Sequence, residues 1–401
     1  MNLNEQIKKL VEEQEQYIID CRHKLHAIPE VCSKEVKTKA FLMEEIKKSG
    51  LPYEEVPTNS IIVKLDTGRP GKVVALRADI DGLPVKESEN NLAGPRACRS
   101  EHDGYCHACG HDAHMAMLLG ALKVLPQLKD QLSGTVLFCF EEGEEQGTGV
   151  DALLAALEKY HVDRCWGIHV YADLAENKMS VDAGPRMAGS AVTTATFKGK
   201  GGHGSRPDMA RNPVFAAAAF LNNLSMVFGQ KITAGQTVTL GITMVHAGEA
   251  SNVIADTAEL SGSFRFFDGE EGKKAVRLFR KTAEETAAIF GCTVEFGPRT
   301  TPEAVGFPVI NDAAAAALAQ RVLPEVLPEG TIVSCEPWYA SESFRKWLAK
   351  YPGVFAFLGI KNEEEGFGAL HHNEKFDLND KVLKTGALAT VRYAAEWLIQ
   401  E

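Results

Sequence analysis

The chain changes its pattern of strands and helices twice, and this limits the folds that it can adopt. In the first 187 residues, short apolar segments alternate with helical stretches, and the apolar segments are 61–65, 72–78, 134–140 and 164–170. The same alternation returns after residue 300, with a strand at 353–360 and a last helix at about 380–399. Such alternation is typical of an α/β layer with a largely parallel sheet. The sequence therefore predicts one α/β domain that is interrupted.

The interrupting segment, 188–300, has a different character. Its strand-like and helix-like runs follow the order β-α-β-β-α-β, which is the ferredoxin-like arrangement with an antiparallel sheet. A chain of 401 residues also exceeds the size at which a single core usually stops growing. We therefore expect a discontinuous α/β domain formed by 1–187 and 301–401, and a smaller inserted α+β domain over 188–300.

Bulk properties exclude several classes of partner. The formal net charge of −11 makes nucleic acid or an anionic membrane a poor partner. The sequence has no run of 18 apolar residues, so it predicts no membrane span. The first residues are polar and lack the apolar centre of a signal peptide. The nine cysteines form no dense framework, which indicates reduced thiols. We therefore expect a cytoplasmic protein.

The densest chemical segment is CHACGHDAHMAMLLG, residues 106–120. Cys109 and His111 stand at the head of an expected helix, close enough for a thiolate and an imidazole to serve one metal site. Taken alone, the pair is also compatible with inert core residues.

A second segment, FCFEEGEEQGTG at 138–149, places four glutamates just beyond a buried strand. Ligands bind at this edge of an open parallel sheet, and metal cations would offset the repulsion between carboxylates. A solvated acidic loop is the alternative.

Three further segments contain histidines. His169 lies at the end of the strand 164–170, His371 and His372 lie in a loop-like region, and His203 lies between glycines in the inserted domain. A lone histidine is more often a satisfied core residue than a ligand. Cysteine, histidine and glutamate recurring at strand ends together predict a two-metal hydrolase site.

These segments make the chain similar to the M20 metallopeptidase family, and specifically to its amidohydrolase branch. The matching stretches run in order along most of the chain: RHKLHAIPE (22–30), LRADIDGLPV (76–85), HACGHDAHMAMLLGA (107–121), GIHVYADL (167–174), GKGGHGSRP (199–207), SNVIAD (251–256) and FLGI (357–360). The resemblance implies a zinc-peptidase-like catalytic domain that holds two metal ions, with the inserted domain as a lid and dimerisation domain. It also implies hydrolysis of an N-acyl or N-aroyl amino acid to a carboxylic acid and a free amino acid.

The resemblance further assigns roles to individual residues. The implied metal ligands are Cys109, His111, Glu145, His169 and His372. Cys109 would bridge the ions, and Glu144 would be the general base and acid acting on a hydroxide held between the metals. Thiolate and imidazole ligands favour Zn, although mixed nitrogen and oxygen sites also accept Mn, Ni or Co.

The inserted domain would contribute to the substrate site. His203 would stabilise the oxyanion from the partner subunit of a homodimer, and Asn252 and Arg265 would bind the substrate. Arg265 is equally compatible with an ordinary exposed strand residue. Asp81 and Asp112 would orient ligand imidazoles, although Asp112 could instead cap the following helix.

The sequence also departs from the family pattern. Glu141, Glu142 and Gly143 replace the usual Gln-Pro-Ala, Ser343 interrupts the usual Ser-Glu-Asp-Phe, and Glu374 replaces a proline. The doubled histidine leaves open whether His371 or His372 is the last ligand. Asp79 is a weaker ligand candidate. Three residues of the 90–106 segment form either a second metal cluster or part of an active-site loop: Cys98, His102 and Cys106.

Three functions remain open at this stage. They are the amidohydrolase just described, a dipeptidase or aminopeptidase of the same fold, and a catalytically dead binding protein. The sequence does not specify the acyl group, the amino acid or the metal.

Overall fold

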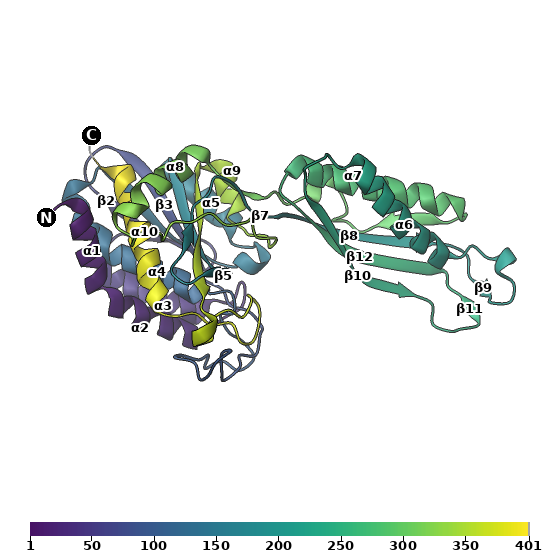
Figure 1. Cartoon of the computed structure of the whole chain (residues 1–401), viewed down its shortest axis with the longest axis horizontal. Coiled ribbons are helices and arrows are strands. Elements are labelled where there is room, and N and C mark those ends of the chain that lie inside the picture. Colours follow the sequence, from purple (N-terminus) through teal and green to yellow (C-terminus); the bar gives the residue numbers. More distant parts are fainter. Residues whose placement is uncertain (400–401) are drawn as a thin grey trace. The chain divides into compact units, whose positions relative to one another are not determined.

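The computed structural model describes residues 1–399, which form two compact units. The first contains Met1–Gly184, Ile310–Glu336 and the described residues from Glu342 onward, and the second contains Pro185–Val309 and Pro337–Ser341 (Figure 1). The short segment 337–341 thus clusters with the smaller unit, although the sequence predicts it in the larger one. Two short strands, β7 (Gly184–Met187) and β14 (Val309–Asn311), span the residues where the chain first leaves the first unit and first returns to it.

The first unit is built on a seven-stranded sheet with the order β1-β2-β4-β3-β5-β15-β6. Its central strands are parallel to one another, and the outer pairs are antiparallel. Strands β2 and β3 are joined by a turn but are not neighbours, because β4 lies between them. The strands are β1 (Tyr53–Glu55), β2 (Ile61–Asp66), β3 (Lys72–Asp79), β4 (Gly134–Glu141), β5 (Arg164–Ala175), β6 (Met179–Ser180) and β15 (Gly353–Lys361).

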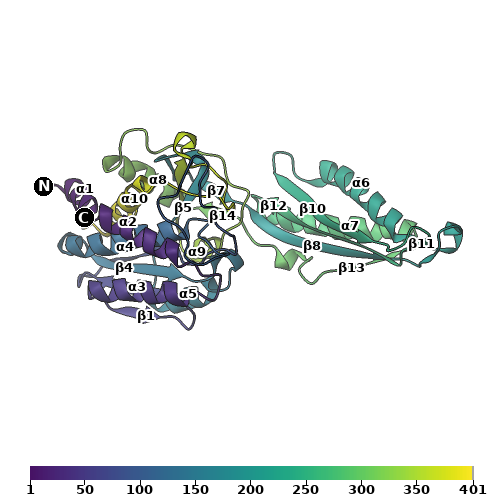
Figure 2. The same ribbon diagram turned by 90° about the horizontal axis from the view of Figure 1, so that it is seen from below.

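Helix α4 (His111–Val124) lies at the centre of this unit. Every residue of α4 except Lys123 is buried, which explains its almost uninterrupted apolar sequence. It packs against β3 and against α1, α2 and α10 (Figure 1; Figure 2). The helices of the unit, besides α4, are α1 (Leu3–Glu13), α2 (Glu15–Ala27), α3 (Val36–Ser49), α5 (Val150–Leu157), α8 (Ala313–Val322), α9 (Arg345–Lys350) and α10 (Lys381–Leu398).

The second unit has the expected β-α-β-β-α-β order. Its four strands pair with the order β10-β12-β8-β13, and every pair is antiparallel. Two long helices pack on this sheet and bury alternate residues of β12 beneath them. The elements are β8 (Gly189–Lys198), α6 (Pro213–Lys231), β10 (Val238–Ala247), β12 (Thr257–Phe266), α7 (Gly269–Ile289) and β13 (Thr293–Phe296), with a small added pair, β9 (Gly202–His203) and β11 (Val253–Ile254).

The mixed α/β fold class is therefore confirmed. The role of the second unit as a lid and dimerisation domain stays a prediction. Within residues 1–399, no helix has the length and the apolar character needed to cross a bilayer.

Candidate metal centre

The carboxyl ends of the parallel strands place several metal-competent side chains at one edge of the larger sheet. Strand β3 ends at Asp79, and β4 ends at Glu141, shortly before Glu145. Helix α4 begins at His111, two residues after Cys109, and Gly110 between them turns the chain with a φ of 88°. His169 lies inside β5, which continues to Ala175 by pairing with β15, so the expected strand end at residue 170 is wrong.

Five side chains from these segments meet in overlapping groups. Ligand atoms of Cys109, His111 and His169 lie within 4.8 Å of one another, as do those of Cys109, Glu145 and His372. The Cys109 Sγ to His169 Nε2 distance is 3.5 Å, and the Glu145 Oε1 to His372 Nε2 distance is 3.3 Å. Cys109 belongs to both groups, which is the position that a bridging ligand requires. The structure thus brings together all five sequence-predicted ligands.

The donor atoms fit a pair of cations. Among the described residues, His111 Nε2 and Glu145 Oε1 are buried and have no hydrogen-bond partner. Burial opposes a charged imidazole, but Asp79, Asp81 and Glu145 outweigh it and raise the pKa of His111 to about 10. The negative potential that favours protonation of the His111 imidazole also favours a metal cation beside it. Burial and then Glu145 raise the pKa of the Cys109 thiol, so a thiolate here needs a nearby cation.

Asp81 holds two of the five residues in place. Its Oδ1 lies 3.1 Å from His111 Nδ1, and its Oδ2 accepts a hydrogen bond of 3.1 Å from the Glu145 backbone N–H. His169 Nδ1 lies 2.6 Å from the Val170 carbonyl oxygen. These contacts leave the opposite nitrogen of each imidazole facing the other ligands, as metal sites require.

Asp112 does not have the expected contact with a ligand imidazole. It accepts a hydrogen bond from Arg22 Nε at 3.0 Å and lies 2.8 Å from His26 Nδ1. It makes no capping hydrogen bond to α4 either. Asp112 therefore ties α4 to α2, a role that the sequence did not indicate.

Asp79 lies beside the centre, and two side chains other than the five predicted ligands hold it there. Its Oδ2 accepts a hydrogen bond of 2.8 Å from Arg77, and its Oδ1 lies 2.6 Å from His114 Nδ1. Burial opposes its ionisation, but His111, His114 and Arg77 hold its pKa well below the usual range. His114 Nε2 accepts a hydrogen bond from the Val170 backbone N–H. Both nitrogens of His114 are thus used, and Asp79 lies beside the centre, with Oδ2 3.6 Å from His111 Nε2.

The two adjacent glutamates do not extend β4. The strand ends at Glu141, Gly143 has a φ of 65°, and Glu144 begins a short 3-10 turn, so strand alternation does not set the directions of these side chains. The Ser343 backbone N–H donates a 2.8 Å hydrogen bond to Glu144 Oε1. Burial, followed by repulsion from Glu342 and Glu145, raises the pKa of Glu144 well above its usual value.

The two adjacent histidines lie in different environments. His372 is half exposed and has a φ of 63°, and its ring reaches Glu145. His371 is more enclosed, and its Nε2 accepts a 3.2 Å hydrogen bond from the Ala172 backbone N–H. Of the two, His372 is therefore the one beside Cys109 and Glu145.

The remaining candidates fall into two sets. His203 and Asn252 lie in the second unit, where Gly204 N–H bonds the Asn252 carbonyl, and His203 lines a cavity of about 640 Å³. Arg265 is partly buried on β12, and its Nη1 donates to the Phe264 carbonyl. Within residues 1–399, the metal-competent groups do not include Cys98, His102 and Cys106, which favours the loop interpretation of that segment.

Sequence reasoning missed a buried charge cluster next to the centre. Arg77 donates to Asp79, Glu141 and Glu342 at 2.8 to 3.0 Å, with all four side chains essentially inaccessible to solvent. The only sequence signal was the position of Arg77 inside the LRAD motif.

Comparison with known proteins agrees with this geometry. The model of "Peptidase family M20/M25/M40" matches residues 75–396. The chain is 35% identical to thermostable carboxypeptidase 2 of Saccharolobus solfataricus, over 97% of each protein. It is 32% identical to N-acetylcysteine deacetylase of Bacillus subtilis, covering 91% of this chain and 93% of that one. A crystal structure of a Bacillus subtilis protein, described as a dinuclear metal binding peptidase from the M20 family, matches with a TM-score of 0.82 and 28% identity, covering 96% of this chain and 99% of that one.

Proposed function

The chain belongs to peptidase family M20/M25/M40, as its motifs predict, and we propose that it hydrolyses the amide bond of N-acyl or N-aroyl amino acids. The products would be a carboxylic acid and a free amino acid. The deacetylase and carboxypeptidase names of its relatives support this reaction class, because both kinds of substrate carry an amide bond next to a free carboxylate.

One observation carries the proposal: five side chains with metal-ligand chemistry converge beside a separately held carboxyl group. We infer that Cys109, His111, Glu145, His169 and His372 hold two divalent ions. When bound, such ions polarise the scissile carbonyl and lower the pKa of water. Thiolate and imidazole donors favour Zn²⁺, with Mn²⁺, Ni²⁺ or Co²⁺ as alternatives.

Glu144 would move the proton. Ser343 N–H fixes its carboxyl group through Oε1, and a Glu144 carboxylate oxygen lies within 4.8 Å of ligand atoms of His111 and Glu145. The raised pKa of Glu144 makes it a stronger base than an exposed carboxylate. It would take a proton from the attacking water and deliver it to the leaving amine.

Three residues of the second unit would complete the site. We propose that His203 stabilises the charge that develops on the carbonyl oxygen, and that Asn252 and Arg265 bind the carboxylate of the substrate. We also propose a homodimer in which His203 acts on the partner's active site. The close contact between the His203 and Asn252 segments supports their acting together.

A second function is favoured by the carboxypeptidase relative. A carboxypeptidase or dipeptidase would use the same ligands and the same base on peptide substrates. A panel of N-acetyl, N-benzoyl and p-aminobenzoyl amino acids, set beside dipeptides and longer peptides, separates the two. We expect the highest kcat/KM on an N-acyl or N-aroyl amino acid.

Glu144→Gln, purified in parallel, is the control for contaminating hydrolases. A preference for peptides would replace the amidohydrolase proposal with the carboxypeptidase one. No turnover on any compound by the metal-loaded protein would favour a binding protein instead.

A further inference from the structure

His372 lies on a segment that has little structure of its own. Residues 366–380 contain no helix or strand, and His372 has a φ of 63°. A non-glycine residue in this left-handed region costs about 1–2 kcal/mol. The His372 N–H donates to the Ala108 carbonyl at 2.9 Å, but the neighbouring Asn373 N–H bond is long, at 3.3 Å. Other contacts must therefore hold this conformation.

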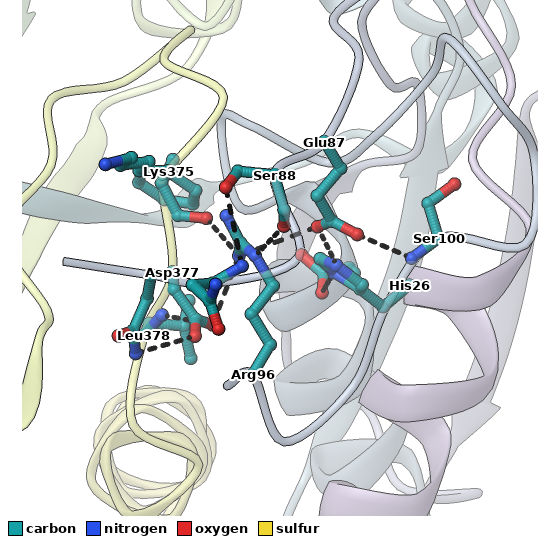
Figure 3. A network of polar contacts seen from close by, with 12 residues as sticks. His26, Glu87, Ser88, Arg96, Ser100, Lys375, Asp377 and Leu378 are labelled. Atoms are coloured by element: carbon teal, nitrogen blue, oxygen red, sulfur yellow. Dashed lines mark hydrogen bonds and ion pairs between the residues drawn. The ribbon is translucent and has the colours of Figure 1, made fainter. Parts of the chain in front are cut away.

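Arg96 supplies such contacts from a second irregular loop, 87–100. Its Nη2 donates to the Glu374 carbonyl at 2.7 Å, and its Nη1 donates to the Phe376 carbonyl at 2.6 Å. Its Nε donates to the Ser88 carbonyl at 2.8 Å, so all three sides of the guanidinium are used. The Ser88 N–H bonds the Glu374 carbonyl as well, at 3.0 Å. The Arg96 side chain is completely buried, and Figure 3 shows it between the two loops.

The same arginine connects this segment to the helix that carries the first ligands. Arg96 Nη1 lies 3.6 Å from Glu87 Oε1, and that oxygen lies 2.7 Å from His26 Nε2. His26 Nδ1 in turn lies 2.8 Å from Asp112, the neighbour of His111 (Figure 3 shows the His26 and Glu87 part). Contacts among charged, buried groups thus run from the His372 segment to the head of α4.

We propose that Arg96 is a positioning residue for the metal centre. It fixes the backbone after His372 through two carbonyls, so that the His372 imidazole stays beside Cys109 and Glu145, and it thereby sets the affinity for metal. This inference rests on the proposed function, because it requires that His372 is a ligand. A point charge at residue 96 would not suffice, since only a planar fork can donate in three directions at once.

Arg96→Lys and Arg96→Gln test the proposal, with Arg99→Lys and Arg99→Gln as matched controls. Arg99 lies on the same loop but is about half exposed, and within residues 1–399 its one ion pair is with the exposed Glu89 at 3.3 Å, a kind of contact that contributes little. The affinity for Zn²⁺ is measured by competition with a chromophoric chelator. The visible spectrum of the Co²⁺-loaded protein reports the coordination geometry.

Both Arg96 variants should bind Zn²⁺ about 10- to 100-fold more weakly, a loss comparable to that from removing a group that orients a metal ligand. Their Co²⁺ spectra should change, and both Arg99 variants should match the native protein. In a His372→Ala background, Arg96→Lys should cause no further loss of affinity, because the ligand through which it acts is gone.

Unchanged Zn²⁺ affinity in a folded Arg96 variant would overturn the proposal, and so would an undiminished effect in the His372→Ala background. Failure of both Arg96 variants to fold, judged from circular dichroism of the metal-free protein, would also overturn it, because Arg96 would then support the whole unit. A native protein that binds no Zn²⁺ would instead refute the proposed function itself.

Discussion

Glu144→Gln and Glu145→Gln should damage the protein in two different ways. At residue 144, an amide oxygen can still accept the 2.8 Å hydrogen bond from Ser343 N–H, so the local structure should persist. Glutamine is no base, however, and general acid–base catalysis typically contributes about 10²–10⁴-fold. This corresponds to about 3–5 kcal/mol of activation free energy. Metal content should stay at the native level while kcat falls by at least that factor.

At residue 145, the substitution should act on the metal. Glu145 Oε1 lies 3.3 Å from His372 Nε2 and 3.8 Å from His111 Nε2. Within residues 1–399, no group donates a hydrogen bond to this oxygen. Loss of a residue that only hydrogen-bonds a metal ligand lowers metal affinity by roughly 10- to 100-fold. Replacing the Glu145 carboxylate itself with a neutral amide should lower metal affinity by more than this.

Elemental analysis after gel filtration and turnover at saturating substrate, measured on both variants, complete the test. If Glu144→Gln loses metal while Glu145→Gln retains it, the two roles are reversed and our reasoning about this turn is refuted.

Three further predictions concern metal, pH and assembly. Exhaustive chelation should abolish turnover and lower the melting temperature, because a ligand at 100 times its Kd adds about 2.7 kcal/mol to the free energy of unfolding. Added Zn²⁺ should restore both. Activity that survives chelation would contradict this prediction. Burial, with repulsion from Asp81, raises the pKa of Glu35 from 4.5 to about 7. Between these two pH values the folded protein binds more protons than the unfolded chain, so it loses stability as the pH rises from 4.5 to about 7. Glu35→Gln should therefore flatten the dependence of melting temperature on pH, and an unchanged slope would count against this cause. The edge strand β10 exposes Met244 and Val245, and an exposed sheet edge tends to pair with another chain. Light scattering should therefore report a dimer, and Val245→Lys should weaken it. A native monomer that is fully active would exclude action of His203 in the partner's site.

The local motifs predicted which side chains converge, because each motif is a short string whose geometry is set nearby. His111 follows Cys109 by two residues, and Gly110 alone makes the turn that starts α4 between them. The position of His169 on a buried strand likewise followed from its apolar neighbours. The doubled histidine could not be resolved this way, because the left-handed backbone of His372 and its hydrogen bond to the distant Ala108 carbonyl have no signature in the local sequence.

Other features depend on parts of the chain that are far apart. The sequence pattern alone does not show how the chain continues after β4, where Gly143 and Gly147 both adopt positive φ and fold Glu144 and Glu145 into a turn. The neighbours of Asp112 come from α2, and those of Arg96 are mainly backbone carbonyls some 280 residues away in sequence. Bonds to carbonyls leave no side-chain pattern, so no motif could have indicated Arg96.

Five side chains of the larger unit should hold two divalent ions. Anomalous diffraction at the zinc edge, from crystals of the Zn²⁺-loaded protein, tests it most directly. We predict two peaks within bonding distance of Cys109, His111, Glu145, His169 and His372, with Cys109 contacting both. An absence of peaks at these residues, or zinc bound only elsewhere in the chain, would contradict the account.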